Sequence, residues 1–261
     1  MAPNALVLTG YGINCDEETK YAFERAGANA RVVHINDLIA NKKSLGNYQI
    51  FAFPGGFSYG DDTGSGNALA NKIRNSMWDE LRSFIDQDRL MIGICNGFQV
   101  MVNLGLLPSL DGKYGERQVA LMHNDSARYF TRWVDLEFKD TSVWTKGLGT
   151  RTIPIAHGEG KLYAPKETLS RVKVAARYVR GEICELQNLP ANPNGSLDDI
   201  AGVQDPSGRV LGMMPHPERA MDFTQLPHWT LLKEQYVREG KDIPQEGPGL
   251  QLFRNGVKYF G

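Results

Sequence analysis

The sequence predicts an α/β protein with a mostly parallel central sheet flanked by helices and a β-rich extension in its second half. In the first half, short apolar runs alternate with helical patterns, an order typical of parallel strands joined by crossover helices. From residue 119 onward, extended stretches follow one another with few helical patterns between them. We expect residues 1–261 to form a single domain.

The elements of the first half are assigned from their ends and their periodicity. A helix is expected over residues 16–26, because acidic residues open it and Gly27 follows it. A longer helix is expected over residues 67–87, where apolar residues recur every three or four positions. The nearly unbroken apolar run at residues 90–94 indicates a central strand buried on both faces. The other strands expected here are residues 5–9, 30–35 and 49–53.

The extended stretches of the second half are expected to pack on this parallel core. The segment Asp205-Pro206-Ser207-Gly208 has the residues of a tight turn, so the stretches on its two sides are expected to pair antiparallel. The expected strands are residues 119–122, 133–138, 153–156, 172–179, 200–203 and 210–214. A helical pattern at about 228–238 precedes the tail at 250–260.

Composition and charge exclude several classes of protein. With 41% hydrophobic and 23% charged residues, the 261-residue chain has the composition of a globular protein. A formal net charge of −1 gives no basic surface for nucleic acid or anionic membranes, so neither is expected as a partner. No signal peptide and no apolar run long enough to span a bilayer is found. The three scattered cysteines, Cys15, Cys95 and Cys184, form no disulfide framework or CxxC site and indicate a reducing, cytoplasmic compartment.

The strand at residues 90–94 runs into Gly93-Ile94-Cys95-Asn96-Gly97, the pattern of a nucleophile elbow with cysteine as the nucleophile. Glycines two residues either side of Cys95 allow a sharp turn from strand to helix, where a Cβ would collide. The helix N-terminus then favours a thiolate on Cys95 and directs the Asn96 N–H toward an oxyanion formed there. The alternative is an ordinary buried cysteine before a helix.

A histidine and a carboxylate follow a later apolar strand, in Met214-Pro215-His216-Pro217-Glu218-Arg219. If the backbone is extended, His216 and Glu218 project to one side, and Glu218 can hold the imidazole in the tautomer that accepts the Cys95 proton. The alternative is a surface loop in which these residues form only a rigid turn.

The segment Phe53-Pro54-Gly55-Gly56-Phe57 follows the strand expected at 49–53. Its adjacent glycines allow close approach of the backbone, so the amide of Gly56 or of Phe57 is a candidate second oxyanion donor. The alternative is an ordinary loop between strand and helix. No Gly-Lys-Ser/Thr phosphate-binding pattern and no calcium-loop spacing is present, so neither a cofactor nor a metal is expected on this chain.

Taken together, residues 54–61, 93–99 and 214–219 resemble the class I, or triad, glutamine amidotransferases. More narrowly, the chain resembles the glutaminase subunits of phosphoribosylformylglycinamidine synthases. Supporting segments lie in family order at residues 12–16, 123–126, 155–160 and 192–196. The resemblance implies a flavodoxin-like α/β fold and a Cys-His-Glu triad of Cys95, His216 and Glu218.

What the resemblance implies can be stated residue by residue. Cys95 would attack the side-chain amide of L-glutamine, His216 would move the proton to the departing ammonia, and Glu218 would orient His216. The amides of Gly56 or Phe57 and of Asn96 would stabilise the oxyanion. The residues expected to hold the substrate are Gln99, Asn124 and Arg128.

The resemblance also implies a partner. The ammonia would pass to a synthetase subunit that converts formylglycinamide ribonucleotide, with ATP and Mg²⁺ bound on that subunit, and a further small subunit is expected to join them. Family members of the free-standing kind are shorter, so a segment at about 224–247 is interpreted as an insertion. Its helical stripe of Trp229, Leu232 and Tyr236 either covers core or packs on a partner.

Three other functions stay open at this point. The chain could be a class I glutaminase that serves a different acceptor, a cysteine hydrolase of related α/β fold, or a catalytically silent binding module.

Overall fold

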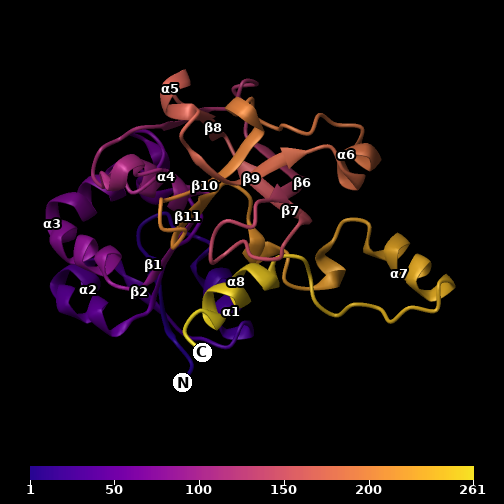
Figure 1. Ribbon diagram of the computed structural model, residues 1–261, viewed down its shortest axis with the longest axis horizontal. Helices are drawn as coiled ribbons and strands as arrows, with labels where there is room; N and C mark the ends of the chain where they lie inside the picture. Colours follow the sequence, from indigo (N-terminus) through magenta and orange to yellow (C-terminus); the bar gives the residue numbers. More distant parts are fainter.

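The computed structural model describes residues 1–261 and has a nine-stranded mixed sheet at its centre, in the order β2-β1-β3-β4-β11-β10-β9-β6-β7 (Figure 1). The pairs from β2 to β11 are parallel, and those from β11 to β7 are antiparallel. A separate antiparallel pair joins β5 to β8. The strands are β1 (Asn4–Thr9), β2 (Asn29–His34), β3 (Ile50–Phe53), β4 (Leu90–Ile94), β5 (Ala120–His123), β6 (Phe130–Phe138), β7 (Thr150–His157), β8 (Glu159–Tyr163), β9 (Lys173–Val179), β10 (Ile200–Gln204) and β11 (Val210–Met213).

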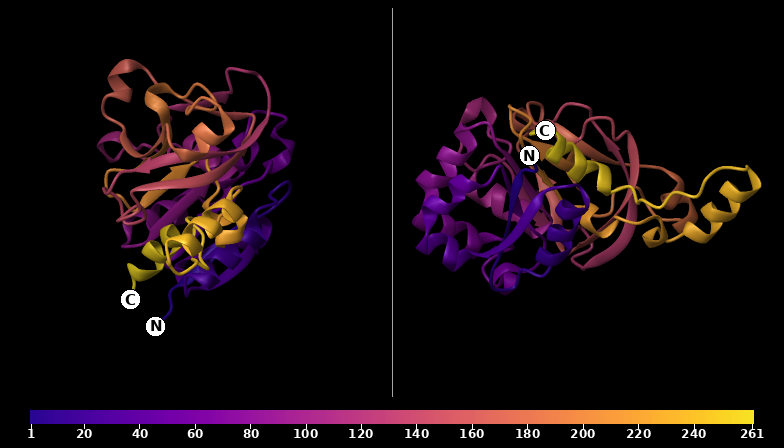
Figure 2. Two further views of the ribbon diagram at one scale, coloured as in Figure 1. Left: turned by 90° about the vertical axis from the view of Figure 1, so that its right-hand side faces the viewer. Right: turned by 90° about the horizontal axis from the view of Figure 1, so that it is seen from below.

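Helices cover both faces of the parallel part of the sheet. The helices are α1 (Asp16–Arg25), α2 (Ile35–Ala40), α3 (Asn67–Asp86), α4 (Asn96–Leu104), α5 (Lys166–Leu169), α6 (Glu182–Gln187), α7 (Trp229–Arg238) and α8 (Leu250–Lys258). Helix α3 packs against α4, and α1 packs against α8. Figure 2 shows these two pairs on opposite sides of the sheet. The predicted α/β class with a β-rich extension is therefore confirmed.

The α1 and α8 layer closes over an aromatic cluster. Phe23 of α1 lies edge-on to Phe253 of α8, with ring centroids 5.0 Å apart, and Phe23 also contacts Trp144 at 6.4 Å. All three rings are fully buried. Burial of such large apolar surfaces holds the C-terminal helix on the N-terminal half of the chain.

The turn predicted at residues 205–208 is confirmed, and β10 and β11 pair antiparallel across it. Asp205 is fully buried, and its carboxylate accepts hydrogen bonds from the backbone N–H groups of Ser207, Arg209 and Val210. An aspartate at this position therefore satisfies three donors that the tight turn would otherwise leave unpaired.

The structure differs from the predicted elements in a few short segments. The strand expected over 30–35 ends at His34, and α2 begins at Ile35 because Nδ1 of His34 accepts the Asn36 N–H at 3.2 Å and caps the helix. Helices α5 and α6 and strand β8 had no prediction, because the two helices span fewer than two turns and the β8 sequence EGKLY has no run of β-forming residues.

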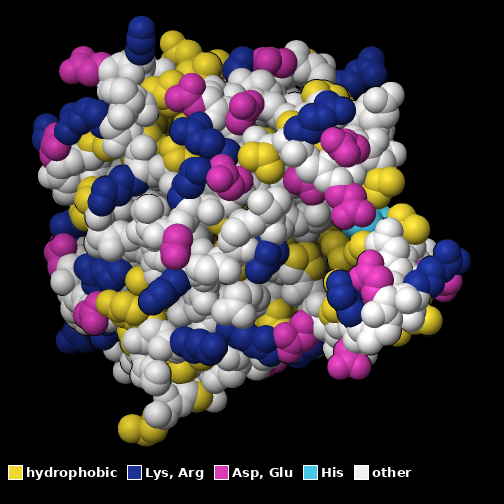
Figure 3. All heavy atoms as spheres, turned by 45° about the vertical axis from the view of Figure 1, so that its right-hand side comes forward, with side chains coloured by type: hydrophobic (Ala, Val, Ile, Leu, Met, Phe, Trp, Pro, Cys, Tyr) yellow, Lys and Arg dark blue, Asp and Glu magenta, His cyan; other side chains and the backbone are white.

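The segment at residues 224–247 forms an arm that projects from the body of the molecule (Figure 1). Helix α7 has no buried residue, and its Trp229, Leu232 and Tyr236 are half-buried. Tyr236 contacts Phe223 at the base of the arm, with ring centroids 6.1 Å apart. In Figure 3 the arm projects at one side of the surface, with hydrophobic side chains in the recess between it and the body. The stripe therefore covers no part of the central core; that the segment is an insertion stays a prediction.

None of the helices combines the length and the apolar character needed to cross a bilayer.

The close contact between β3 and α4 generates a test of the fold. A Cβ added to Gly97 would lie 1.8 Å from the carbonyl oxygen of Phe53, so backbone would have to move. We expect Gly97→Ala to lower the free energy of unfolding by about 3 kcal/mol, at the upper end of typical overpacking costs. Gly46→Ala is the matched control, because a Cβ there meets no atom within 4 Å. Urea unfolding measures both, and equal stabilities of the two variants would contradict this account.

Candidate functional site

Cys95 lies at a strained turn between β4 and α4, the two elements predicted to form the elbow. Its backbone has φ 51° and ψ −109°, a left-handed φ that costs a non-glycine residue about 1–3 kcal/mol. Gly93 and Gly97 make the turn possible, since a Cβ on Gly93 would lie 2.8 Å from the backbone of Gly97. The N–H of Cys95 donates to the carbonyl oxygen of Met213 at 2.8 Å, which fixes the turn against the end of β11.

His216 and Glu218 form a buried pair after β11. Nδ1 of His216 and Oε1 of Glu218 are 2.6 Å apart, and the residues are only 2% and 3% exposed. Pro217 begins a one-turn helix, η5 (Pro217–Arg219), so the backbone is not extended through Glu218 as the sequence suggested. The turn brings the carboxylate back to the imidazole. The N–H of His216 donates to the carbonyl oxygen of Pro154 at 2.8 Å, which ties this loop to β7.

The charges around the imidazole favour its protonated form. Burial lowers the pKa of His216, but the negative charge of Glu218 and that of a Cys95 thiolate outweigh burial and raise this pKa well above its usual value. Nε2 of His216 has no hydrogen-bond partner within the chain, and Sγ of Cys95 lies 3.6 Å from the carbonyl oxygen of Ala156. The imidazole therefore has one nitrogen held by Glu218 and the other free for proton transfer.

A cavity of about 160 Å³ gives access to Cys95. Its lining consists of Gly56, Phe57, Asp61, Ser65, Cys95, Gln99, His123, Ala127, Arg128, Tyr129, Ala156, His157, Gly158 and Glu159. Of the residues predicted for the site, this lining therefore includes Gly56, Phe57, Cys95, Gln99 and Arg128. His216, Glu218, Asn96 and Asn124 lie behind it and are buried.

Two backbone N–H groups beside Cys95 have no acceptor in the chain, those of Gly56 and Asn96. The N–H of Phe57 donates to the carbonyl oxygen of Gly12 at 2.7 Å, so of the two amides considered in this loop only that of Gly56 is free. Gly56 has φ +148°, and a Cβ there would lie 2.7 Å from the Gly12 carbonyl oxygen. Only glycine fits at position 56. The free N–H groups of Gly56 and Asn96 together match the two donors of an oxyanion hole.

Side-chain amides organise the wall of the cavity. Nδ2 of Asn96 donates to Oδ1 of Asp61 at 3.3 Å and to Oε1 of Gln99 at 2.9 Å, and Oδ1 of Asn96 accepts the Ser58 N–H. Nε2 of Gln99 in turn donates to the carbonyl oxygen of Glu159. Both ends of the Gln99 amide are thus bonded to the protein, and this residue shapes the wall.

Asn124 holds the loop that carries Arg128. Its Nδ2 donates to the carbonyl oxygens of Arg128 and His157, each at 2.9 Å, and its Oδ1 lies 3.1 Å from Nδ1 of His157. These contacts use all the polar groups of Asn124, while the Arg128 side chain is exposed at the cavity. The two candidates for substrate binding therefore occupy different layers, Arg128 at the cavity and Asn124 behind it.

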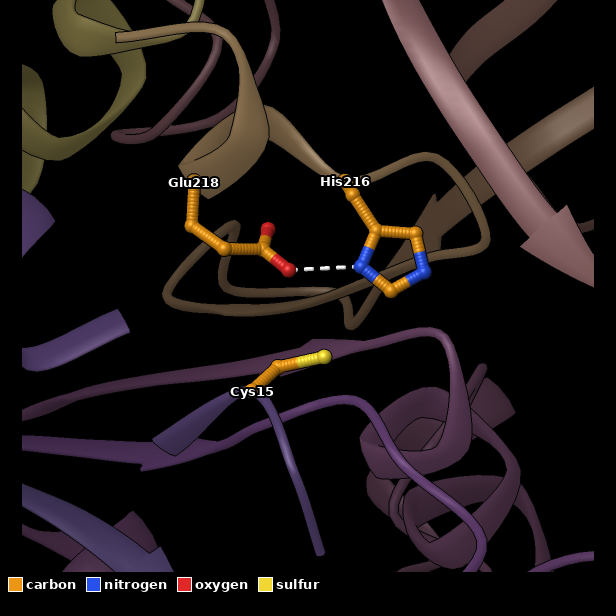
Figure 4. Close-up of side chains that lie close together, drawn as sticks. All are labelled: Cys15, His216 and Glu218. Carbon is orange, nitrogen blue, oxygen red and sulfur yellow. Dashed lines mark hydrogen bonds and ion pairs between the residues drawn. The ribbon is translucent and has the colours of Figure 1, made fainter. Parts of the chain in front are cut away.

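The sequence had suggested no role for Cys15 and Arg219, which lie beside the His216–Glu218 pair. Sγ of Cys15, a ring nitrogen of His216 and a carboxylate oxygen of Glu218 lie within 4.8 Å of one another (Figure 4). Cys, His and Glu are metal-ligating types, but Nη2 of Arg219 donates to Sγ of Cys15 at 3.0 Å, so a cation at this sulfur would meet a like charge. The only indication in the sequence of a role for Cys15 was that residues 12–16 form one of the segments supporting the family resemblance.

The cavity also contains two carboxylates that sequence reasoning did not assign to it, Asp61 and Glu159. The Ser65 hydroxyl lies 3.0 Å from Oδ2 of Asp61, and the Ser65 N–H donates to Oε2 of Glu159 at 3.3 Å. Burial raises the pKa of Asp61, and the nearby charge of Glu159 also raises it. His123 lies 3.4 Å from Oε1 of Glu159 at the exposed side.

Comparison with known proteins gives concordant matches along the whole chain. Residues 2–260 match the family described as the CobB/CobQ-like glutamine amidotransferase domain. The chain is 50% identical to phosphoribosylformylglycinamidine synthase subunit PurQ of Methanococcus maripaludis, over 100% of this chain and 98% of that protein. It is 42% identical to the subunit of the same name from Dehalococcoides mccartyi, over 97% and 96% of the two chains. A solved structure of PurLQS from Thermotoga maritima contains a chain that matches with a TM-score of 0.73 and 31% identity, over 100% of both chains.

The buried His157 generates a test by pH. Burial, with a smaller effect of the His216 charge, lowers the pKa of His157 to about 3. The unfolded chain takes up a proton on this residue below about pH 6.5, whereas the folded chain resists it, so His157 makes stability fall as the pH drops from about 6.5 toward 3. The slope is up to about 1.4 kcal/mol per pH unit. We expect His157→Gln to have a flatter dependence of the unfolding free energy on pH between 6 and 4. An equal pH dependence of the unfolding free energy in the wild type and in His157→Gln would contradict a buried His157 that stays neutral.

Proposed function

The chain belongs to the glutamine amidotransferase family that includes the PurQ subunits of phosphoribosylformylglycinamidine synthase, and on this premise we propose that it hydrolyses L-glutamine with Cys95, His216 and Glu218. The ammonia passes to a synthetase subunit that converts formylglycinamide ribonucleotide to formylglycinamidine ribonucleotide in purine biosynthesis. The observation that carries the proposal is the position of Cys95. It lines a cavity at a strained elbow, two free backbone N–H groups lie nearby, and its charge acts on a histidine held by a carboxylate.

The first half of the reaction forms a thioester. Sγ of Cys95, as a thiolate, attacks the side-chain carbonyl carbon of glutamine, and the carbonyl oxygen becomes an oxyanion. When this intermediate collapses, the C–N bond breaks and the protonated His216 gives its proton to the leaving nitrogen, which departs as ammonia. Glu218 keeps the imidazole oriented and stabilises its charge throughout.

The second half restores the enzyme. A water molecule attacks the thioester carbon while His216 takes a proton from it, and collapse of the second oxyanion breaks the C–S bond. Glutamate leaves, and the thiolate of Cys95 and the imidazolium of His216 return. The N–H groups of Gly56 and Asn96 stabilise both oxyanions, and one such donor is typically worth a factor of about 10² to 10³ in rate.

The charged groups of the cavity suit the two ends of an α-amino acid. The guanidinium of Arg128 would pair with the α-carboxylate of glutamine, which matches its planar fork. The carboxylates of Asp61 and Glu159 would attract the α-ammonium group. Asn124 would influence substrate binding by fixing the backbone of Arg128, and Gln99 would do so by shaping the cavity wall.

The surroundings of the cavity support docking of the synthetase over its mouth. Phe57 and Tyr129 line the cavity with their rings 6.0 Å apart, yet they are 40% and 51% exposed. Exposed aromatic side chains of this kind are enriched at protein interfaces. A subunit seated here would cover Cys95 and keep ammonia from escaping into water.

The remaining parts of the proposal concern the assembly and its setting. ATP and Mg²⁺ are assigned to the synthetase subunit, a further small subunit joins the assembly, and neither metal nor cofactor is assigned to this chain. The three free cysteines support a reducing, cytoplasmic location. Residues 1–261 are taken as one amidotransferase domain, with an insertion at about 224–247.

Removal of the nucleophile tests the proposal. In the complex with the synthetase, we expect Cys95→Ala to abolish glutamine-dependent amidation and glutamate release, because no thioester forms. The same complex should keep its activity with added ammonium, since the synthetase reaction does not need Cys95. A glutamine-analogue electrophile should label the wild-type chain at Cys95 only. Glutamate release by the Cys95→Ala variant would refute the proposed triad.

Replacement of Arg128 tests the binding of the substrate. We expect Arg128→Met to raise the KM for glutamine about tenfold or more, because a charge-assisted bidentate contact is lost, and to change kcat little. Arg180→Met is the matched control, since Arg180 is also exposed but lines neither the Cys95 cavity nor the pocket next to it. Steady-state assays of glutamate release compare the variants. An unchanged KM in Arg128→Met would show that Arg128 does not bind glutamine.

A further inference from the structure

A second thiol lies beside the catalytic pair, and the reaction proposed above uses only the first. Cys15 is the residue that precedes α1, so its position is set by a different element from those that carry Cys95 and His216. In Figure 4 its sulfur lies alongside the hydrogen bond that joins His216 to Glu218. Cys15, His216 and Glu218 are all buried.

The sulfur of Cys15 is held from several directions. Nη2 of Arg219 donates to it at 3.0 Å, and Nε of the same guanidinium donates to Oε2 of Glu18 at 3.2 Å. The Cys15 thiol lies 3.2 Å from Oδ1 of Asn14 and can donate to it. Because Arg219 directly follows Glu218, it joins the loop of the catalytic pair to the first turn of α1 through this sulfur.

The space around the imidazole is filled on the same side by backbone. A Cβ on Gly55 would lie 2.7 Å from Cε1 of His216 and 3.0 Å from Sγ of Cys15, so the backbone at Gly55 packs against both. The carbonyl oxygen of Gly55 also accepts the N–H of Cys15 at 3.2 Å. Loss of the sulfur would therefore leave a gap beside the ring that a rigid backbone could not close.

Cys15 does not compete with Cys95 as the nucleophile. Burial raises the pKa of the Cys15 thiol, and the charge of Glu218 also raises it, against the lowering effects of His216 and Arg219. The side chain is 1% exposed and is absent from the lining of the cavity that reaches Cys95. A neutral thiol without access to substrate can act only through its neighbours.

We propose that Cys15 is a positioning residue for the glutaminase reaction: its sulfur holds the imidazole of His216 against displacement, and Arg219 holds the sulfur. This inference rests on the proposed function of Cys95, His216 and Glu218. The imidazole must stay within reach of both Glu218 and Cys95 through two proton transfers, and a displacement of about 1 Å in such a group can cost up to about 10² in rate.

The sulfur also favours the charged state of the ring. The Cys15 side chain, as a group that can hydrogen-bond to the ring, raises the pKa of His216, together with the negative charges of Glu218 and of a Cys95 thiolate. The titratable and charged groups around His216 are Glu218 and Arg219 on its own loop, Cys15 and Glu18 at α1, Cys95 at α4, His157 on β7 and Tyr129. Of these, Cys15 has its sulfur within 4.8 Å of both members of the pair, and it does not line the cavity.

The test compares four variants of the full chain in complex with the synthetase. Cys15→Ala removes the sulfur, Cys15→Val fills the volume without a hydrogen-bonding group, and Cys15→Ser restores such a group. Cys184→Ala is the matched control, because Cys184 is equally buried but lies on α6 away from the site. The measurements are kcat and KM for glutamine, the dependence of kcat/KM on pH, and the ammonium-dependent activity of the same complex.

We expect Cys15→Ala and Cys15→Val to lower kcat for glutamine by about ten- to hundredfold with little change in KM. On the alkaline side of the pH profile (the basic limb), their kcat/KM should also begin to fall at a lower pH than that of the wild type, because the imidazolium of His216 is less stabilised. Cys15→Ser should retain most of the activity and the wild-type limb. Cys184→Ala should match the wild type, and ammonium-dependent activity should be unchanged in all variants.

Wild-type kcat and an unmoved basic limb in Cys15→Ala or Cys15→Val would overturn the proposal. A loss of activity that is uniform across pH and equal in Cys15→Ser would also overturn it. If Cys15→Ala does not fold, the comparison of Cys15→Val with Cys15→Ser decides in the same way. The proposed function fails separately, if the wild type releases no glutamate or Cys95→Ala still does.

Discussion

The parallel pairing of three adjacent strands, β3, β4 and β11, is the constraint on which the site depends. In this register Phe53 lies opposite Gly93, and Ile94 lies opposite Met213, so the three strands end at the same edge of the sheet. The loops that follow them carry the Gly56 amide, the Cys95 thiol and the His216 imidazole. Residues that are about forty and one hundred and twenty positions apart in the chain are therefore neighbours, because the carboxyl ends of parallel strands meet.

The antiparallel half of the sheet completes the site from the other side. The second wall of the cavity consists of the end of β7, with Ala156 and His157, and of the loop that carries Arg128. Asn124 supports this wall through its hydrogen bond to the carbonyl oxygen of His157. The hydrogen bond from the His216 N–H to the Pro154 carbonyl oxygen joins the two halves at the imidazole itself. The cavity thus lies where the parallel core and its β-rich extension meet, and neither half contains it alone.

The buried polar groups at this junction do not add to stability in any simple way. A histidine and a carboxylate removed from water cost desolvation energy that their mutual attraction only offsets. One carboxylate oxygen of Glu218 and Nε2 of His216 also lack partners within the chain. Buried polar groups without partners and strained backbone cluster at functional sites, and here the strained backbone of Cys95 and the unpaired N–H groups follow the same pattern.

The sequence alone predicted the fold class and the elbow at Cys95, since both depend on local patterns: alternating strands and helices, an apolar strand and two glycines. The pair His216 and Glu218 was predicted through the resemblance of residues 214–219 to the triad amidotransferases, because the motif by itself also fits a rigid turn. Only the tertiary structure decided which amide is free, because the Phe57 N–H is taken by Gly12, a residue far away in sequence. It likewise placed Asn124 behind the cavity and Cys15 beside the imidazole. Those assignments depend on contacts between elements distant along the chain, and no periodicity or motif records which polar group will find a partner once the chain has folded.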